Sequence, residues 1–169
     1  MDVIEAIRTK RALRVFQDRP LPDDVLTAIL NAGRRAQSSK NSQPWHFVVV
    51  RERATLVALS KLGTYAGHLA GAALAVVIVT PDPAQRWSIM FDAGQSAAYM
   101  QIAAWDLGVG SCPATIYEPE QAEALLGIPP EWHVHAALSF GYPAEPAGSQ
   151  APKRAGRRAL GDVVHYGKW

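Results

Sequence analysis

The sequence predicts one domain, residues 1–169, that contains both helices and buried strands. Its length of 169 residues lies near the usual size of a single domain. An apolar content of 49% is ordinary for a globular protein that buries a core. Helical apolar stripes and short β-rich runs both occur along the chain.

The N-terminal half is predicted to contain two helices, then a strand and a short helix. Residues 2–9 place their apolar side chains on one helical face. Residues 22–36 are the stronger candidate, because Pro22 suits a first helical turn and the two aspartates after it favour the positive end of a helix. The apolar run 47–51 predicts a strand, and residues 55–61 predict a short helix with its leucines inward.

The second half is predicted to hold two strands and the longest helix. Residues 74–80 are β-rich and are closed by Pro81, which indicates a buried strand. Residues 86–107 are apolar or small on more than one face, which places this helix in a core or against another subunit. The other segments expected here are a short, partly extended piece at 111–117, a helix at 118–126 and a strand at 134–140.

Residues 143–158 contain prolines and glycines and few large apolar side chains. Such a composition predicts a segment without regular structure that runs over the surface or along a partner. Residues 159–166 carry Leu160, Val163 and Val164, and we expect this segment to be apolar enough to dock.

The formal net charge of +2 gives no reason to expect a nucleic-acid partner, and the chain lacks the aromatic interleaving and motifs of such proteins. Its basic residues nevertheless cluster near the two ends, at Arg8, Lys10, Arg11 and Arg14 and at Lys153, Arg154, Arg157 and Arg158. Because chain termini often lie close together, the two clusters could converge into an anion site.

A single cysteine excludes an intramolecular disulfide and a multi-cysteine zinc site. The N-terminus is charged where a signal peptide has an apolar core. The longest apolar run, residues 72–79, is too short to span a bilayer. We therefore expect a cytoplasmic protein without a membrane partner.

The familiar catalytic motifs are absent or incomplete. Residues 108–113 resemble a dinucleotide-binding turn, but the last glycine is missing and the turn follows a helix rather than a strand. His133 and His135 share one face of a strand, and two histidines favour a structural or pocket-lining role over a metal site. Cys112 displays no activating base. If the chain is an enzyme, a cofactor carries its chemistry.

The most distinctive stretch is the loop 38–45, Ser-Ser-Lys-Asn-Ser-Gln-Pro-Trp. Its two side-chain amides each offer a donor and an acceptor in one plane, which suits the edge of a flat heterocycle. The alternative is an ordinary polar turn, in which Asn, Ser and Pro serve the local backbone geometry. Trp45, at the start of the following strand, is expected to belong to the core.

Three segments in this order resemble the FMN-dependent nitroreductase family: the basic segment 8–16, the loop 38–45 and the basic segment 157–166. The loop is the most specific of the three. The resemblance implies an α+β fold with a central, mostly antiparallel sheet flanked by helices. It also implies an interlocked homodimer, in which C-terminal segments cross to the partner and two FMN sites lie at the interface.

For the FMN phosphate, the resemblance implies contacts from basic residues near both termini, namely Lys10, Arg11, Arg14 and either Arg157 or Arg158. Ala12 stands where the family usually has Ser. The missing hydroxyl contact should weaken cofactor binding by about 0.5–1.5 kcal/mol.

For the ring and ribityl chain, the resemblance implies contacts from the loop of the partner subunit, through Ser38, Ser39, Asn41 and Gln43. Pro113, Ala114 and Thr115 should run along one flavin face, with the backbone N–H groups of Ala114 and Thr115 near flavin N5. No side chain is assigned as catalytic. His68 is expected on the ribityl or pyrimidine side, and a position on a helix surface is the alternative.

The resemblance implies an NAD(P)H-dependent flavin oxidoreductase of the nitroreductase type. NADH or NADPH would give a hydride to flavin N5, and an electron-poor acceptor such as a nitroaromatic or a quinone would then take it in a ping-pong sequence. The alternatives are specialised flavin chemistry on one metabolite, such as oxidation or dehalogenation, and a flavin-binding protein without turnover.

Overall fold

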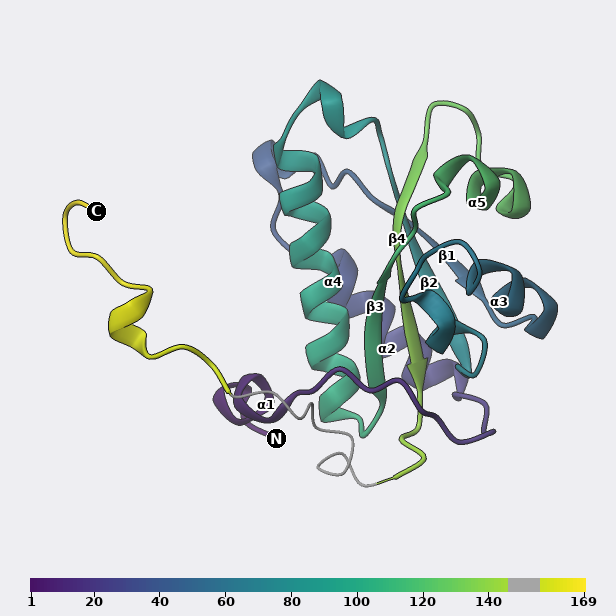
Figure 1. Cartoon of the computed structure of the whole chain (residues 1–169), viewed down its shortest axis with the longest axis horizontal. Coiled ribbons are helices and arrows are strands. Elements are labelled where there is room, and N and C mark those ends of the chain that lie inside the picture. The colour runs from purple at the N-terminus through teal and green to yellow at the C-terminus, as the bar shows by residue number, and fades with distance from the viewer. Residues whose placement is uncertain (146–155) are drawn as a thin grey trace.

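The computed structural model describes residues 1–145 and 156–169 and contains a four-stranded sheet (Figure 1). The strands lie in the order β1-β2-β4-β3, and each neighbouring pair is antiparallel. Their bounds are His46–Val50 for β1, Leu74–Thr80 for β2, Gly110–Thr115 for β3 and His133–Gly141 for β4. Helices cover both faces, so the predicted α+β architecture with an antiparallel sheet is confirmed.

Strand β2 lies in the interior of the sheet because its sequence is apolar on both sides. Every one of its residues is buried. Leu74, Val76 and Ile78 face one core, whereas Ala75 and Val77 face the other, since successive strand residues point to opposite faces. A strand that is covered on both faces therefore shows a continuous apolar run instead of an alternation.

The helices form a layer on each face of the sheet (Figure 1). On one face, α2 (Asp23–Arg34) packs against α4 (Ser88–Asp106), and α1 (Val3–Thr9) contacts α4. The other face is covered by α3 (Arg53–Leu59), the short 3₁₀-helix Ala66–Leu69 and α5 (Pro119–Leu126). The two faces thus have separate apolar cores.

Two helices begin two residues from their predicted starts, and a capping carboxylate explains each of these differences. The carboxylate of Glu52 accepts two backbone N–H bonds, so α3 starts at Arg53 rather than at residue 55. Asp82 caps a separate 3₁₀ turn ahead of the long helix, which consequently begins at Ser88.

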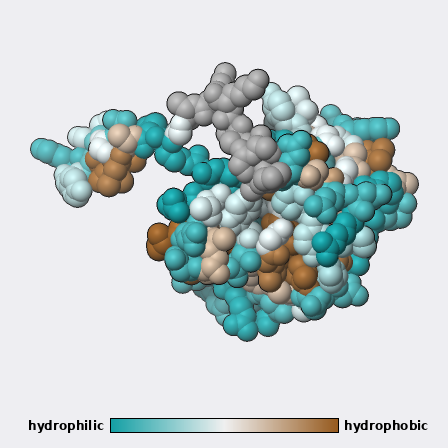
Figure 2. Space-filling model, turned by 90° about the horizontal axis from the view of Figure 1, so that it is seen from below, coloured by the Kyte–Doolittle hydropathy of each residue, from teal (hydrophilic) through white to brown (hydrophobic). Residues whose placement is uncertain are grey.

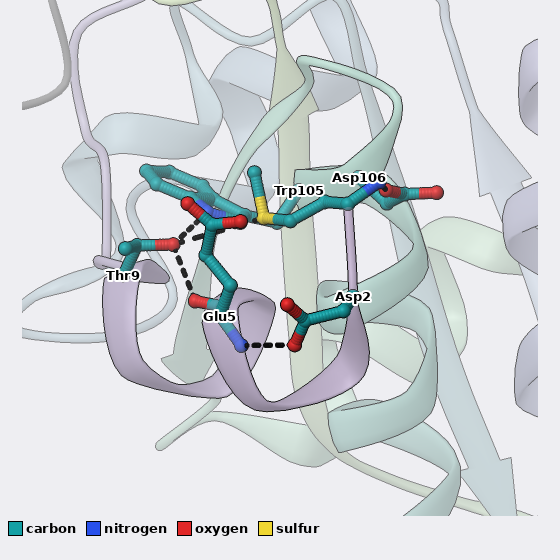
Figure 3. Close-up of polar contacts among 6 residues, drawn as sticks. Asp2, Glu5, Thr9, Trp105 and Asp106 are labelled. Atoms are coloured by element: carbon teal, nitrogen blue, oxygen red, sulfur yellow. Dashed lines mark hydrogen bonds and ion pairs between the residues drawn. The ribbon is translucent and has the colours of Figure 1, made fainter.

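Helix α1 is tied to the C-terminal end of α4 by polar contacts (Figure 3). The N-terminal ammonium group forms an ion pair with Asp106 at 2.8 Å. The indole N–H of Trp105 donates to the Thr9 hydroxyl at 3.0 Å. The Asp2 carboxylate caps α1 by accepting from the N–H of Glu5 at 2.9 Å. Contacts at both ends of α1 thus fix the direction in which the chain leaves it.

After α1, the chain runs along the outer edge of β3. The N–H of Leu13 donates to the carbonyl of Ser111 at 3.0 Å, and Ala12 forms a parallel bridge with the same residue. Leu13 is fully buried, whereas its neighbour Arg14 is exposed. The segment therefore covers an otherwise open strand edge and holds basic side chains beside it.

The C-terminal residues 156–169, called the arm below, extend away from the body of the molecule (Figure 1). The arm contains one short turn, Leu160–Asp162. Leu160 is 74% exposed and Trp169 is 99% exposed, and Figure 2 shows apolar side chains gathered on the arm. The expected docking of residues 159–166 is therefore not made against the residues that the structure describes. Most of the predicted irregular segment, residues 146–155, lies outside the described residues.

Two glycines near the 3₁₀-helix differ in the space around them, which provides a test of the packing beside β3. A Cβ added to Gly63 would lie 2.2 Å from the Thr115 carbonyl oxygen, whereas a Cβ on Gly67 meets nothing within 4 Å. We predict that Gly63→Ala lowers the free energy of unfolding by about 1–3 kcal/mol, the usual penalty for overpacking. Gly67→Ala should leave it unchanged or raise it by up to about 1 kcal/mol. Urea unfolding followed by tryptophan fluorescence measures both, and equal losses would contradict this geometry.

Candidate functional site

Lys10 lies where α1 ends, between α4 and the edge of β3. Its ammonium group donates to Oε1 of Gln101 on α4 at 2.5 Å. Burial lowers the pKa of Lys10, the nearby Cys112 thiol opposes this change, and the positive charge of Arg157 lowers the pKa further. An interaction between Lys10 and Arg157 means that the structure brings together basic residues from the two ends of the chain.

Arg14 belongs to the same neighbourhood, because its charge acts on two buried groups. Burial raises the pKa of the Cys112 thiol, and the positive charges of Arg14 and Lys10 oppose that rise. Burial and the charge of Arg14 both lower the pKa of His68. The edge of β3 thus has cations on its outer side and neutral, buried polar groups behind them.

The other two basic candidates, Arg11 and Arg158, make hydrogen bonds to nearby carbonyl groups. The guanidinium of Arg11 donates to the carbonyls of Arg8 and Lys10, each at 2.9 Å, and so covers the end of α1. Arg158 donates to the carbonyl of Asp162 within the arm. Of the two C-terminal candidates, Arg157 is therefore the one whose charge acts at Lys10.

His68 is buried, with 7% of its surface exposed, so the alternative of a helix-surface position is wrong. Its Nδ1 lies 2.8 Å from the hydroxyl oxygen of Ser139, which in turn donates to the carbonyl of Cys112 at 3.2 Å. The pKa of His68 is lowered by burial first and by Arg14 second, and the Pro113 carbonyl opposes this. Its Nε2 is buried and has no hydrogen-bond partner among the described residues. Buried polar side-chain atoms are usually hydrogen-bonded, so this ring nitrogen is available to a further partner.

The pairing of β3 with β4 decides which backbone groups of the predicted turn are available. The N–H of Ile116 donates to the carbonyl of His135 at 3.0 Å. Because alternate residues of an antiparallel pair face the partner strand, the N–H of Ala114 also points into the sheet, and that of Thr115 points outward. Pro113 occupies an outward position too, where its missing N–H leaves the ladder intact.

The loop 38–45 has an unusual backbone. Lys40, Asn41 and Gln43 have φ values of 53°, 54° and 47°, in the left-handed region that residues other than glycine rarely adopt. Asn41 and Gln43 are exposed. Trp45 is 7% exposed and belongs to the core, as predicted.

The loop is held against the N-terminal half of α4. The Asp92 carboxylate accepts from the backbone N–H of Ser39 at 3.0 Å. The Arg86 guanidinium donates to the hydroxyl of Ser42 at 2.7 Å. A side-chain hydroxyl within the loop, that of Ser38, accepts from the N–H of Gln43 at 2.9 Å. These bonds keep the strained backbone in one conformation.

Within one chain, the loop and Lys10 contact different parts of α4. Lys10 contacts α4 at Gln101, and the loop contacts α4 at Asp92. The two positions are nine helical steps apart, a rise of roughly 13 Å. The structure therefore groups Lys10, Arg14, His68, Pro113–Thr115 and Arg157 at one place and Ser38, Ser39, Asn41 and Gln43 at another.

Two kinds of site find no support in the part of the chain that the structure describes. No group of three or more His, Cys, Asp or Glu residues is arranged to hold a metal ion. His133 instead lies 3.4 Å from the carboxylate of Glu123, a structural contact. No described helix combines the length and the apolar character needed to cross a membrane.

Sequence reasoning missed two residues of the site, Ser139 and Gln101. Ser139 is a fully buried hydroxyl among the apolar residues of the second half of β4, and its position within that apolar run was the available signal. Gln101 lies on a helix that is apolar nearly all round, and nothing in the sequence indicates that it contacts Lys10.

Together, the sheet, its two helical layers and the cationic strand edge define an α+β protein with basic residues gathered beside an edge strand. A family model described as the Nitroreductase family matches residues 7–66 and 59–142, more than half of the chain. The chain therefore belongs to the nitroreductase family.

Two relatives align with this chain over nearly its full length. A protein of Archaeoglobus fulgidus named NADH dehydrogenase/NAD(P)H nitroreductase is 32% identical, with 99% of each chain covered. A protein of the same name from Methanothermobacter thermautotrophicus is 30% identical over 100% of this chain and 88% of its own.

Solved structures share the fold. An FMN-dependent nitroreductase from Clostridium difficile R20291 aligns with a TM-score of 0.85 at 28% identity, covering 98% of this chain and 99% of its own. The NADPH:FMN oxidoreductase of Vibrio harveyi, solved with NAD⁺, aligns with a TM-score of 0.86 at 23% identity, covering 99% of this chain and 77% of its own. At the latter identity the likeness concerns the fold alone.

The burial of His68 predicts a dependence of stability on pH. The folded pKa of His68 lies below the ordinary value of 6.5. Below pH 6.5 the unfolded chain therefore binds more protons than the folded one, and the free energy of unfolding falls as the pH falls. We predict that His68→Asn, which removes the titrating group, loses less stability between pH 7.5 and pH 5 than the wild type. Urea unfolding at both pH values measures this, and parallel losses would argue against a neutral, buried His68.

Proposed function

We propose that this protein is an FMN-dependent oxidoreductase that uses NADH or NADPH to reduce an electron-poor acceptor. One observation carries the proposal: the cations Lys10, Arg14 and Arg157 converge at the edge of β3 beside the buried, unpartnered Nε2 of His68. The family assignment and the FMN-dependent relative of known structure support it.

The cations suit a phosphate group. Burial, and to a smaller extent the positive charge of Arg157, lower the pKa of Lys10, and a bound dianion would stabilise its charged form. Arg14 adds a planar guanidinium that can bind phosphate through two N–H groups at once. Ala12 contributes no hydroxyl at this point, and its backbone is occupied by the bridge to Ser111.

The neighbouring groups suit a flavin ring and its ribityl chain. The outward N–H of Thr115 is the backbone donor proposed to face flavin N5, in preference to the N–H of Ala114, which serves the sheet. Pro113 presents an exposed, apolar ring beside it. The Nε2 of His68 would gain its missing partner from a ribityl hydroxyl or from the pyrimidine edge.

When bound, FMN supplies the redox chemistry, in which hydride from NAD(P)H is delivered to a nitroaromatic, a quinone or a similar acceptor in a ping-pong sequence. The chain's own residues hold and orient that group. Lys10, Arg14 and Arg157 fix the phosphate end, and the edge of β3 fixes the ring end. No side chain is assigned to proton transfer.

We further propose a homodimer in which the loop 38–45 reaches the site of the partner. Along α4 the contacts of Lys10 and of the loop lie roughly 13 Å apart, so the loop lies away from Lys10 of its own chain. The exposed apolar side chains of α1 and α4 border a hollow of about 470 Å³, lined by Val3, Ile7, Tyr99 and Ile102 among others. That hollow and the exposed arm are surfaces that a second copy would cover.

Removing Arg14 tests the phosphate assignment. We predict that Arg14→Ala raises the Kd for FMN about 10- to 100-fold, the expected effect of losing a hydrogen bond to a charged group. Arg34→Ala is the matched control, because Arg34 is exposed on α2 and its side chain hydrogen-bonds only to Asn31 among the described residues. Fluorescence titration of flavin-free protein gives both constants. Full flavin retention in purified Arg14→Ala protein would refute the assignment.

Hybrid dimers test whether the loop serves the partner. One chain carries Arg14→Ala, and the other carries Asn41→Ala with Gln43→Ala. If the loop acts across the interface, one of the two sites in the hybrid has both an intact Arg14 and an intact loop, and the hybrid binds about half the flavin of the wild type. If the loop acts within its own chain, both sites are defective. Differently tagged chains, purified together and assayed for bound flavin, distinguish these results.

A further inference from the structure

A hollow on the surface of the molecule, called the arginine hollow below, gathers three guanidinium groups. It has a volume of about 210 Å³ and is lined by Asp18, Arg19, Pro20, Leu21, Arg51, Arg53 and Ala73. The three arginines come from the segment ahead of α2, from the residue after β1 and from the first residue of α3. No residue of this lining belongs to the group that the structure places at the edge of β3.

Two of the arginines are oriented by hydrogen bonds. The Arg53 guanidinium donates through Nη1 to the carbonyls of Ala70 at 2.5 Å and Ala72 at 3.0 Å. Arg51 donates through Nη2 to the carboxylate of Asp23 at 2.6 Å. A guanidinium carries five N–H donors on three nitrogens, so these bonds use only part of each group. Both arginines are therefore held in place and keep donors for a ligand.

Arg19 is placed by stacking. Its guanidinium carbon lies 4.1 Å from the centroid of the Tyr142 ring, and its side chain makes no hydrogen bond to the residues that the structure describes. The backbone N–H of Gln17 donates to the carbonyl of Tyr142 at 2.8 Å, which holds this segment beside the ring. A guanidinium that lies on an aromatic face keeps its N–H edge for an anion.

The charges around the hollow do not cancel. The lining contains three arginines and one carboxylate, that of Asp18, whose side chain is fully exposed and lies 4.0 Å from Arg53. An exposed ion pair of this kind is weak, so Asp18 leaves Arg53 available. Asp23 offsets the charge of Arg51 from outside the lining. The hollow therefore keeps a net positive charge.

We propose that the arginine hollow binds a small phosphate monoester. Guanidinium groups bind phosphate through paired N–H bonds, and a monoester offers three strong acceptor oxygens to the three arginines. A volume of about 210 Å³ lies below the usual size of a pocket for a drug-sized ligand, so the proposed occupant is a phosphate on a short carbon chain. The apolar surfaces of Pro20, Leu21 and Ala73 would contact that chain. The inference does not depend on the proposed function.

Calorimetric titration of the purified protein with glycerol 3-phosphate tests the proposal. We expect one binding site in the hollow with a Kd below about 1 mM. Arg19→Gln should raise that Kd about tenfold, the effect of losing a hydrogen bond to a charged group. Arg34→Gln, which changes an exposed arginine on α2, is the matched control and should leave it unchanged. Asp18→Asn should lower the Kd roughly two- to threefold, because it removes the carboxylate of the lining.

The edge of β3 also gathers cations, so Arg14→Ala is titrated in parallel. Unchanged binding in Arg14→Ala, together with weaker binding in Arg19→Gln, would support the arginine hollow as the site. The reverse pattern would overturn the proposal, because the phosphate would then bind beside β3. Unchanged constants in both Arg19→Gln and Asp18→Asn would also overturn it. Succinate is the control ligand, and binding as tight as that of glycerol 3-phosphate would contradict a site for phosphate.

Discussion

The backbone hydrogen bond from Leu13 to Ser111 fixes the position of the segment that carries the basic residues. An edge strand exposes unpaired N–H and carbonyl groups, and proteins cover such edges with a loop or a helix. Here the covering segment holds Leu13 in the core and leaves Lys10 and Arg14 beside the strand. The same contact that covers the sheet edge thereby places positively charged side chains beside it.

The polar groups behind that edge are buried, and hydrogen bonds and neutral charge states offset the cost of that burial. His68, Ser139 and the Cys112 carbonyl form a short chain of hydrogen bonds under the cations. Burial favours the neutral forms of His68 and Cys112, as the directions of their pKa changes show. Neutral groups on the inside and cations on the outside give an anion a charged surface to approach without placing a second charge in the core.

Periodicity located most of the fold, because apolar stripes and continuous apolar runs follow directly from which faces are covered. The buried strand at 74–80 and the long helix against α2 are examples. Helix starts were less accurate, since Glu52 and Asp82 act through caps that the apolar pattern does not record. The depth of His68 could not be predicted either, because a four-residue 3₁₀-helix has no apolar repeat.

Three residues of the loop, Lys40, Asn41 and Gln43, adopt a backbone conformation that costs about 1–3 kcal/mol per residue. Hydrogen bonds from the loop to Asp92 and Arg86 hold that conformation without the help of a ligand. The ordering of the loop is thus completed during folding, and little conformational entropy remains to be lost when a ligand arrives. Glycine at these positions would remove the backbone strain, but it would also allow the loop to adopt many more conformations. The chain gives up some resistance to unfolding and keeps a recognition surface that is already in its final form.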